Sequence, residues 1–274
     1  MTMAGSIARG RGGTLDRATR EFYQAALGVI KGSGLPFMVG GAYAFNYYTG
    51  VERHTKDFDI FVREEDCQRA LDIFARAGYR TELTHPHWLG KAYCGDDAYM
   101  DIIFNSGNGV AKVDDEWFAR AHACEILGIP VKLIPAEEMI WSKGFIMERE
   151  RFDGADVAHL IHAWAHKMDW RHLLERYGAN WRVLYCHLVL FGYDYPGERD
   201  KIPAWLMREL SGRLLAEVRT PPVDERLCQG TLVSREQFLP DVEQWGYSDA
   251  REAEGFMSAE DIQHWTDAIT GAHG

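Results

Sequence analysis

The stretch FMVGGAYAFNYYTGVERHTKDFDIFV, residues 37–62, contains two short apolar segments that enclose a pair of glycines. The second segment carries Asp57 and Asp59 inside an otherwise apolar run. Because side chains two residues apart in a strand point to the same face, the two carboxylates lie together, about 7 Å apart along the chain, and the apolar residues form the other face. Buried charge is costly unless it is paired. The pattern therefore predicts a ligand for both carboxylates.

A divalent cation is the ligand that these carboxylates favour. Two carboxylates this close repel each other, which pushes one of them toward protonation. Hard oxygen ligands suit Mg²⁺, or Mn²⁺ in its place. Asp101, in the apolar segment AYMDIIFN, supplies a third carboxylate. If the two strands are neighbours, the three carboxylates meet and can hold metal ions for an in-line displacement at phosphorus. The alternative is that these are edge-strand aspartates that face solvent.

Gly40 and Gly41 lie between a predicted buried strand and a predicted short helix. Glycine lets backbone amides approach a phosphate closely, and the start of the helix adds a favourable dipole. Alone this signal is weak, since a strand-to-helix turn often needs glycine for its backbone geometry. Its position upstream of the two aspartates makes a phosphate-binding turn the interpretation we adopt.

These residues carry a resemblance to a known family. The stretch resembles the signature of the nucleotidyltransferase superfamily related to DNA polymerase β, and its form is similar to that of the AbiEii toxin-like group. The matching positions are Gly40, Gly41, Ala44, Gly50, Arg53, Thr55, Asp57 and Asp59, with Asp101 as the third acid. Gly41 stands where many members have a serine, so a hydroxyl contact to the terminal phosphate is missing.

The resemblance implies an activity. The protein is expected to be a Mg²⁺-dependent enzyme that moves a nucleoside monophosphate from a triphosphate such as ATP to an acceptor hydroxyl and releases pyrophosphate. Asp57, Asp59 and Asp101 are the expected catalytic and metal-binding residues. The acceptor, which could be an RNA 3′ end, a protein hydroxyl or a small molecule, is left open. The other functional class is a catalytically silent nucleotide-binding or toxin–antitoxin module of the same fold.

The nucleotide-binding residues expected from the resemblance are Gly40, Gly41, Arg53, Thr55 and Lys143. A point charge such as the Lys143 ammonium suits a triphosphate. Arg53 binds phosphate or pairs with an aspartate.

Residues 149–156 leave alternatives open. Arg149 and Arg151 either belong to the site or form an ion-paired helix surface with neighbouring glutamates. Asp153 and Asp156 are either the second acidic pair of the toxin-like group or a cap for the next helix.

The fold expected is an α/β (α+β) nucleotidyltransferase-like domain with a short mixed sheet, followed by a mostly helical C-terminal domain. We expect a flexible tail over 1–13, the catalytic domain over 14–135 and the helical domain over 136–274. Strands are expected at 35–39, 57–62, 88–94, 98–104 and 131–134. Helices are expected at 14–31, 42–48, 64–77, 136–149, 154–168, 169–177, 180–191, 202–217, 235–245 and 258–269.

Composition excludes several other classes. The net charge of −11 argues against a broad basic face that wraps nucleic acid. Five cysteines without a CxxC pair indicate reduced thiols, no disulfide framework and a cytoplasmic protein. No apolar run has membrane-spanning length. His159, His162 and His166 could share a helix face and bind zinc, but a histidine stripe beside Trp164 is more often a packing contact.

Overall fold

The computed structural model describes residues 17–52, 57–95, 98–221 and 226–270. Within these ranges a mixed seven-stranded sheet has the order β3-β4-β5-β2-β1-β7-β6, and a second sheet pairs β8 with β9. The strands are β1 (Met38–Val39), β2 (Asp57–Phe61), β3 (Arg80–His85), β4 (Leu89–Cys94), β5 (Ala98–Ile103), β6 (His122–Ile126), β7 (Ile129–Leu133), β8 (Leu227–Cys228) and β9 (Ser248–Asp249). The mixed sheet that we expected is confirmed, although it is larger than the expected one.

The centre of the sheet is made by β2 and β5, which run parallel with Asp59 directly opposite Asp101. On the far side β5 pairs antiparallel with β4, which places Lys91 opposite Asp101. Alternation along both central strands sends Phe58 and Met100 into the core, where each is fully buried. The polar residues of the same strands consequently share the other face of the sheet.

Two amphipathic helices, α1 (Arg17–Gly32) and α3 (Glu64–Arg76), cover the apolar face of the sheet. Buried residues recur three or four positions apart along both helices, as in the series Phe22, Ala26 and Ile30 of α1. Helix α3 is followed by Gly78, whose φ of +91° is in the left-handed region that glycine adopts without strain. These helices hold the sheet rigid behind its polar face.

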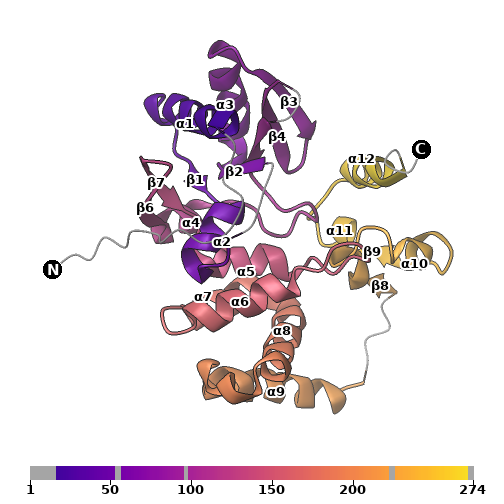
Figure 1. Ribbon diagram of the computed structural model, residues 1–274. Coiled ribbons are helices and arrows are strands. Elements are labelled where there is room, and N and C mark those ends of the chain that lie inside the picture. The colour runs from indigo at the N-terminus through magenta and orange to yellow at the C-terminus, as the bar shows by residue number, and fades with distance from the viewer. Residues whose placement is uncertain (1–16, 53–56, 96–97, 222–225, 271–274) are drawn as a thin grey trace.

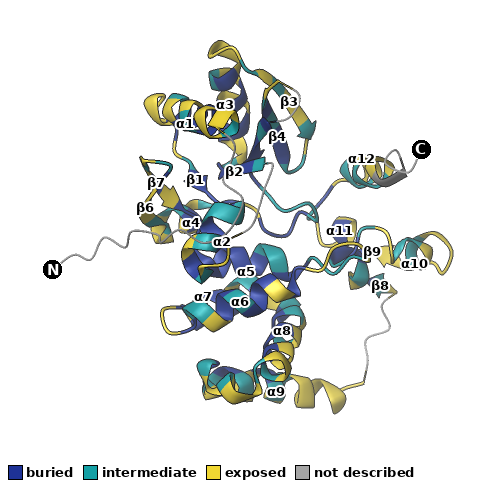
Figure 2. Ribbon diagram, viewed as in Figure 1, coloured by how far each residue is buried: buried dark blue, intermediate teal, exposed yellow. Residues whose placement is uncertain are grey.

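The remaining helices lie on the other side of the sheet and toward the C-terminus (Figure 1). They are α2 (Gly41–Thr49), α4 (Asp115–Arg120), α5 (Ala136–Gly144), α6 (Gly154–Trp164), α7 (Trp170–Tyr177), α8 (Trp181–Asp194), α9 (Ala204–Val218), α10 (Leu239–Glu243), α11 (Ala250–Ala253) and α12 (Ala259–Thr270), with short 3₁₀ helices at Gly178–Asn180, Pro196–Lys201 and Gln229–Leu232. Figure 2 shows that α5 and α6 are mostly buried, whereas α9 and α12 are largely exposed. None of the helices in the described ranges is long and apolar enough to cross a membrane.

One apolar cluster contains buried residues of the sheet and of helices α5 to α9. Helix α2 packs against α6. The ring of Phe45 in α2 lies 6.3 Å from the ring of His159 in α6, measured between the centroids. The division of the chain near residue 135 into two domains stays a prediction. What the packing does establish is that α6 packs against α2 and that α5 packs against α6.

The C-terminal segment, residues 226–270, touches both the sheet and the helices. The Met147 amide donates to the Val233 carbonyl at 3.0 Å, and α12 packs on β3. Trp265 of α12 stands edge-on to His85, with 4.8 Å between the ring centroids. Burial and the neighbouring His264 lower the pKa of His85 to about 4, so this ring is neutral and packs as an aromatic group. The segment thus joins the two halves of the molecule along one side (Figure 1).

Several expected element boundaries were wrong. The first strand is only Met38–Val39, the helix expected at 136–149 ends at Gly144, that expected at 154–168 ends at Trp164, and that expected at 235–245 is only Leu239–Glu243. A bridge between Met147 and Phe152 folds the chain back after α5 and prevents the helix from continuing. Strands β3 and β6 and helix α4 were missed altogether. The expected tail, the first residues of the helix expected at 14–31 and residues 96–97 between two expected strands lie outside the described residues.

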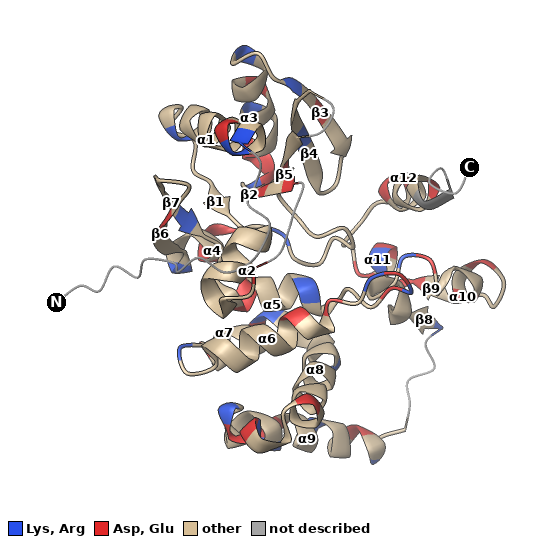
Figure 3. Cartoon of the chain, in the orientation of Figure 1, with Lys and Arg blue, Asp and Glu red and all other residues tan. Residues whose placement is uncertain are grey.

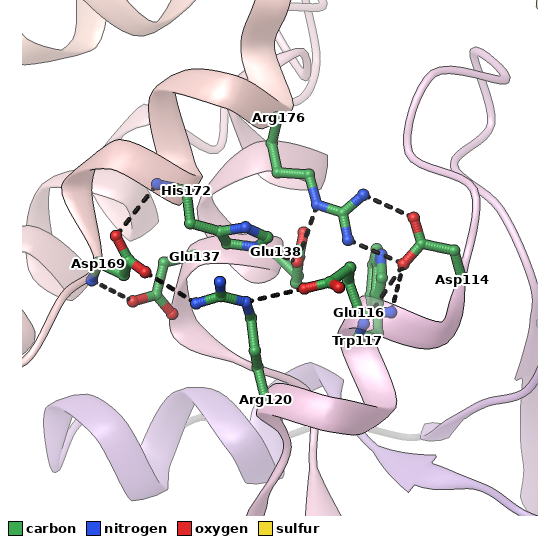
Figure 4. Close-up of polar contacts among 9 residues, drawn as sticks. All are labelled: Asp114, Glu116, Trp117, Arg120, Glu137, Glu138, Asp169, His172 and Arg176. Atoms are coloured by element: carbon green, nitrogen blue, oxygen red, sulfur yellow. Dashed lines mark hydrogen bonds and ion pairs between the residues drawn. The ribbon is translucent and has the colours of Figure 1, made fainter.

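A buried ionic network ties α5, α7 and α4 together (Figure 4). Glu138 of α5 is fully buried, and its Oε1 lies 2.7 Å from His172 Nε2 and accepts from Arg176 Nε at 3.0 Å. The Arg176 guanidinium also donates two hydrogen bonds, of 2.6 and 2.8 Å, to Asp114 at the start of α4. Such bidentate pairs are short and geometrically specific. The network therefore fixes the helical region to the loop that follows the sheet.

Replacing Arg176 with alanine should destabilise the fold by about 3–5 kcal/mol, because it leaves the Glu138 carboxylate buried without its guanidinium partner. Urea denaturation followed by far-UV circular dichroism measures the change. Arg213→Ala is the matched control, since Arg213 is an exposed arginine that pairs with Glu209 within α9. The control should change stability by less than about 0.5 kcal/mol. Equal shifts of the two unfolding curves would contradict the importance of the network.

Candidate active site

Three carboxylates converge on the polar face of the sheet. Asp57, Asp59 and Asp101 each offer an oxygen, and these oxygens all lie within 4.8 Å of one another. Within the described part of the chain no other group of three or more His, Cys, Asp or Glu side chains brings ligand atoms so close together. Figure 3 shows the acidic positions of β2 and β5 beside each other. The neighbouring strands that the sequence suggested are therefore real, and the structure brings the three predicted acids together.

The electrostatics of the cluster are unfavourable without a cation. Burial, together with the charges of Asp57 and Asp101, raises the pKa of Asp59 to about 7, although Lys143 and Lys91 oppose the rise. Burial also raises the pKa of Asp101, again against the influence of Lys91. Like charges held this close disfavour ionisation, and a divalent cation removes the repulsion. Three convergent hard oxygen donors fit a divalent metal ion.

The glycine turn lies directly against these carboxylates. Gly41 is the first residue of α2 and has a φ of +53°. A Cβ atom at position 41 would stand only 1.6 Å from Asp59 Oδ2, and one at Gly40 only 2.2 Å from the Phe61 ring. A side chain at either position would thus require Asp59 or Phe61 to move. The missing serine has a structural reason here, since a residue other than glycine at 41 would displace the Asp59 carboxylate.

Helix α2 begins beside this turn without a side-chain cap. Gly40 occupies the N-cap position and has no side chain with which to cap the first turn of the helix. The first backbone N–H groups of a helix lack partners within it, and the dipole makes this end favourable for anions. Because Gly41 lies against the Asp59 carboxylate, the backbone N–H donors at the start of α2 are beside a prospective metal-binding group.

Lys143, at the end of α5, is held by two carboxylates. Its Nζ lies 2.7 Å from an oxygen of Asp153 and 2.7 Å from an oxygen of Asp156. Asp153 also accepts two hydrogen bonds from Arg151, at 3.1 and 3.0 Å. Since Lys143 lowers the pKa of Asp59, its charge acts on the triad. Lys143 thus acts electrostatically on Asp59, while its ammonium pairs with Asp153 and Asp156.

The alternatives for residues 149–156 are decided by these contacts. Asp153 stands at the N-cap position of α6, but its side chain makes no capping hydrogen bond and pairs with Lys143 and Arg151. Arg149 and Arg151 lie outside any helix, so the ion-paired helix surface was wrong. Arg149 is exposed, and Glu148 pairs with Arg235 of the C-terminal segment.

Lys91 of β4 is the residue that sequence reasoning missed. Its Nζ contacts Asp101 Oδ1 at 2.5 Å and lies 4.1 Å from the centre of the Tyr99 ring. The sequence signal for Lys91 was a lone lysine in the strand LGKAYC, on the same face of the strand as Tyr93. It was not decisive, because only the pairing register of β4 and β5 places Lys91 opposite Asp101.

Two expected site residues and a candidate histidine stripe are left to consider. Arg53 and Thr55 lie outside the described residues. His166 follows the end of α6, and His162 pairs with Glu198 at 3.2 Å. Among the described residues the three histidines of the stripe belong to no group that could hold a metal ion. The packing interpretation of this stripe is the better one, as the ring contact of His159 with Phe45 illustrates.

Comparison with known families adds to this geometry. A family model described as "Nucleotidyl transferase of unknown function (DUF2204)" matches residues 19–177, which is more than half of the chain. The chain belongs to this family. As a member, the DUF2204 protein is a nucleotidyltransferase, and the superfamily resemblance of its sequence is confirmed. The AbiEii toxin-like subgroup stays a prediction. None of the curated proteins matches the sequence significantly.

Three solved structures that are similar to this nucleotidyltransferase are distant from it in sequence. The antibiotic-resistance factor ANT(2'')-Ia is 18% identical with a TM-score of 0.45, over 66% of this chain and 100% of that chain. An antigenic nucleotidyltransferase-like protein from Paracoccidioides brasiliensis is 13% identical with a TM-score of 0.44, over 68% and 93%. The lincosamide antibiotic adenylyltransferase LnuA is 15% identical with a TM-score of 0.37, over 52% and 94%.

Proposed function

We propose that this protein is a Mg²⁺-dependent nucleotidyltransferase that transfers a nucleoside monophosphate to an acceptor hydroxyl. A bond forms between the acceptor oxygen and the α-phosphorus, and the bond from that phosphorus to the pyrophosphate leaving group breaks. The acceptor loses its proton in the same reaction. The observation that carries this proposal is the convergence of three carboxylates, with oxygens within 4.8 Å of one another, beside the glycine turn at the start of α2.

The carboxylates are proposed as the metal-binding and catalytic groups. Asp57 and Asp59 would hold the cation from one strand, and Asp101 would hold it from the neighbouring strand. When bound, the metal supplies positive charge for the phosphate oxygens at the reacting centre. Asp101 would also lie close to the reacting centre, where its carboxylate can accept the proton of the acceptor hydroxyl.

The nucleotide phosphates are proposed to lie over the turn at Gly40 and Gly41. Backbone N–H groups at the uncapped start of α2 are donors that need no side chain, and the absence of Cβ atoms permits close approach. Lys143 would bind the β and γ phosphates, with its ammonium held in place by Asp153 and Asp156. Arg53 and Thr55, which precede the acids in the sequence, are proposed as further phosphate contacts.

The contacts described above do not distinguish between classes of acceptor. An RNA 3′ end, a protein hydroxyl and a small molecule remain the three candidates, and the net charge of −11 is least favourable for RNA. The donor is proposed to be a nucleoside triphosphate such as ATP. A catalytically silent nucleotide-binding or toxin–antitoxin module is the alternative function. The complete set of three acids favours catalysis over this alternative, because binding alone does not require all of them.

The decisive experiment incubates the protein with Mg²⁺ and each of the four α-labelled ribonucleoside triphosphates. Cell RNA, cell protein and a small-molecule extract serve as separate acceptor fractions. We expect pyrophosphate release and transfer of label to one fraction, with both lost in Asp59→Ala. Equal release by the wild type and this variant, or no release with any fraction, would overturn the enzymatic proposal. Calorimetric titration with nucleotide would then identify a silent binding module.

A further inference from the structure

A row of charged residues crosses three strands of the sheet. Asp59 of β2 is paired with Asp101 of β5, and Asp101 is paired in turn with Lys91 of β4. Directly opposite residues of neighbouring strands place their side chains on the same face of a sheet, close enough to interact. The position of Lys91 is thus set by the same backbone register that brings the carboxylates together.

The Lys91 side chain is unusually confined for a lysine. It is only 17% exposed, its Nζ lies 2.5 Å from Asp101 Oδ1, and the Tyr99 ring stands 4.1 Å away. Lysine is rarely buried unless it is paired, and ordering its long side chain costs entropy. Two partners, the Asp101 carboxylate and the Tyr99 ring, both contact the ammonium and hold it in one place. This geometry differs from that of an exposed ion pair within one strand, such as Arg80 with Glu82 on β3, whose side chains are 62% and 47% exposed.

The contact has a consequence for Asp101. The Lys91 ammonium contacts Oδ1 of Asp101. A carboxylate that is bound through one oxygen presents mainly its other oxygen to further ligands. The partner of a metal-binding group commonly orients that group and changes metal affinity or activity by about 10- to 100-fold when it is lost. Lys91 is also a positive charge beside a prospective cation site, so it competes electrostatically with a metal ion.

We propose that Lys91 is a positioning residue that acts through Asp101. It holds Asp101 in a single orientation with Oδ2 directed to the reaction, and it limits how tightly the carboxylates bind a cation before the nucleotide arrives. The turnover part of this inference rests on the proposed function, whereas the metal-binding part rests only on the three carboxylates. A merely structural lysine would affect stability alone. A positioning lysine predicts opposite effects on metal affinity and on turnover.

The test replaces Lys91 with methionine, which keeps the length of the side chain and removes the charge. Mn²⁺ alone is titrated into the full-length, nucleotide-free protein and the free ion is followed by electron paramagnetic resonance. We expect Lys91→Met to bind Mn²⁺ about tenfold more tightly than the wild type. We expect its kcat for pyrophosphate release to fall about 10- to 100-fold with little change in KM for the triphosphate.

Three further variants complete the design. Lys132→Met removes the same charge from an exposed position on β7 and should leave both quantities within about twofold of the wild type. Lys91→Arg retains the charge and should return Mn²⁺ affinity toward the wild-type value. In the Asp101→Asn background, adding Lys91→Met should have no further effect on turnover, because residues that act through one another are not additive.

The outcomes separate the two proposals. Weaker Mn²⁺ binding in Lys91→Met, or changes no larger than those of Lys132→Met, would overturn the inference about Lys91. If Lys91→Met fails to fold, Lys91→Gln carries the same test because it also removes the charge, and Mn²⁺ binding no tighter than that of the wild type in this variant would overturn the inference. Absence of pyrophosphate release by the wild type would instead overturn the proposed function. The Mn²⁺ titration needs neither nucleotide nor acceptor, so it remains decisive for Lys91.

Discussion

Replacement of Asp59 with asparagine should abolish nucleotidyl transfer and, at the same time, stabilise the metal-free protein. Asp59 is the carboxylate whose pKa is raised most clearly within the triad, to about 7, by burial and by the charges of Asp57 and Asp101. Removing a metal-binding group deprives the reaction of several kcal/mol of charge stabilisation, which corresponds to a rate loss of about a thousandfold or more. Function and stability thus make opposite demands on this residue.

The sign of the stability effect follows from linkage. The unfolded Asp59 ionises near its usual pKa of 3.8, whereas the folded, metal-free carboxyl keeps its proton until about pH 7. The free energy of unfolding of the metal-free protein therefore falls as the pH rises from about 4 to 7, and the loss is complete above pH 7. Asparagine carries no such charge. At pH 8 we expect Asp59→Asn to be about 4 kcal/mol more stable, or roughly 8–16 °C in Tm.

Thermal unfolding in the presence of EDTA, compared with unfolding in excess Mg²⁺, measures this effect. Mg²⁺ should raise the Tm of the wild type and leave Asp59→Asn unchanged, because a ligand stabilises only the state that binds it. Asp72→Asn is the control, since Asp72 is an exposed acid on α3. The expectation is wrong if Asp59→Asn unfolds at or below the wild-type temperature in EDTA, or if it still releases pyrophosphate.

The second large effect is expected for Gly41→Ala. The φ of +53° strains any other residue, and the added Cβ would meet Asp59 Oδ2 at 1.6 Å, so the carboxylate must move. Displacing a reacting group by about 1 Å costs on the order of a hundredfold in rate. Backbone strain in the left-handed region adds a stability loss of about 1–3 kcal/mol. We therefore expect loss of pyrophosphate release together with modest destabilisation.

Gly34→Ala separates the two causes. Gly34 has a φ of +75°, but a Cβ there would have nothing within 4 Å. This control should show the backbone strain, measured by urea denaturation, with full pyrophosphate release. If Gly41→Ala were as active as Gly34→Ala, the close contact between the turn and Asp59 would have no part in the reaction. A stability loss confined to Gly41→Ala would contradict the strain at Gly34.

Local patterns account for the features that were predicted correctly. Alternation along β2 places Asp57 and Asp59 on one face whatever the rest of the chain does, because the period of a strand is two. The same rule separates Asp101 from its apolar neighbours. The end of the helix predicted at 64–77 was placed by the glycine that follows it, which is also a local signal. By contrast β3, with the sequence RTELTH and mainly exposed or half-exposed residues, has no apolar alternation and was missed.

By itself the sequence determined the family and the three acids that converge, and it predicted the glycine turn and Lys143 as phosphate-binding groups. It did so because each of these features depends on residues that are close together in the chain or on a motif of the nucleotidyltransferase family. Only the tertiary structure decided that Lys91 contacts Asp101 and that Lys143 is held by Asp153 and Asp156. It also decided that Asp59 excludes a side chain at Gly41. These contacts join separate elements, and their geometry depends on strand register and helix packing, which no local pattern specifies.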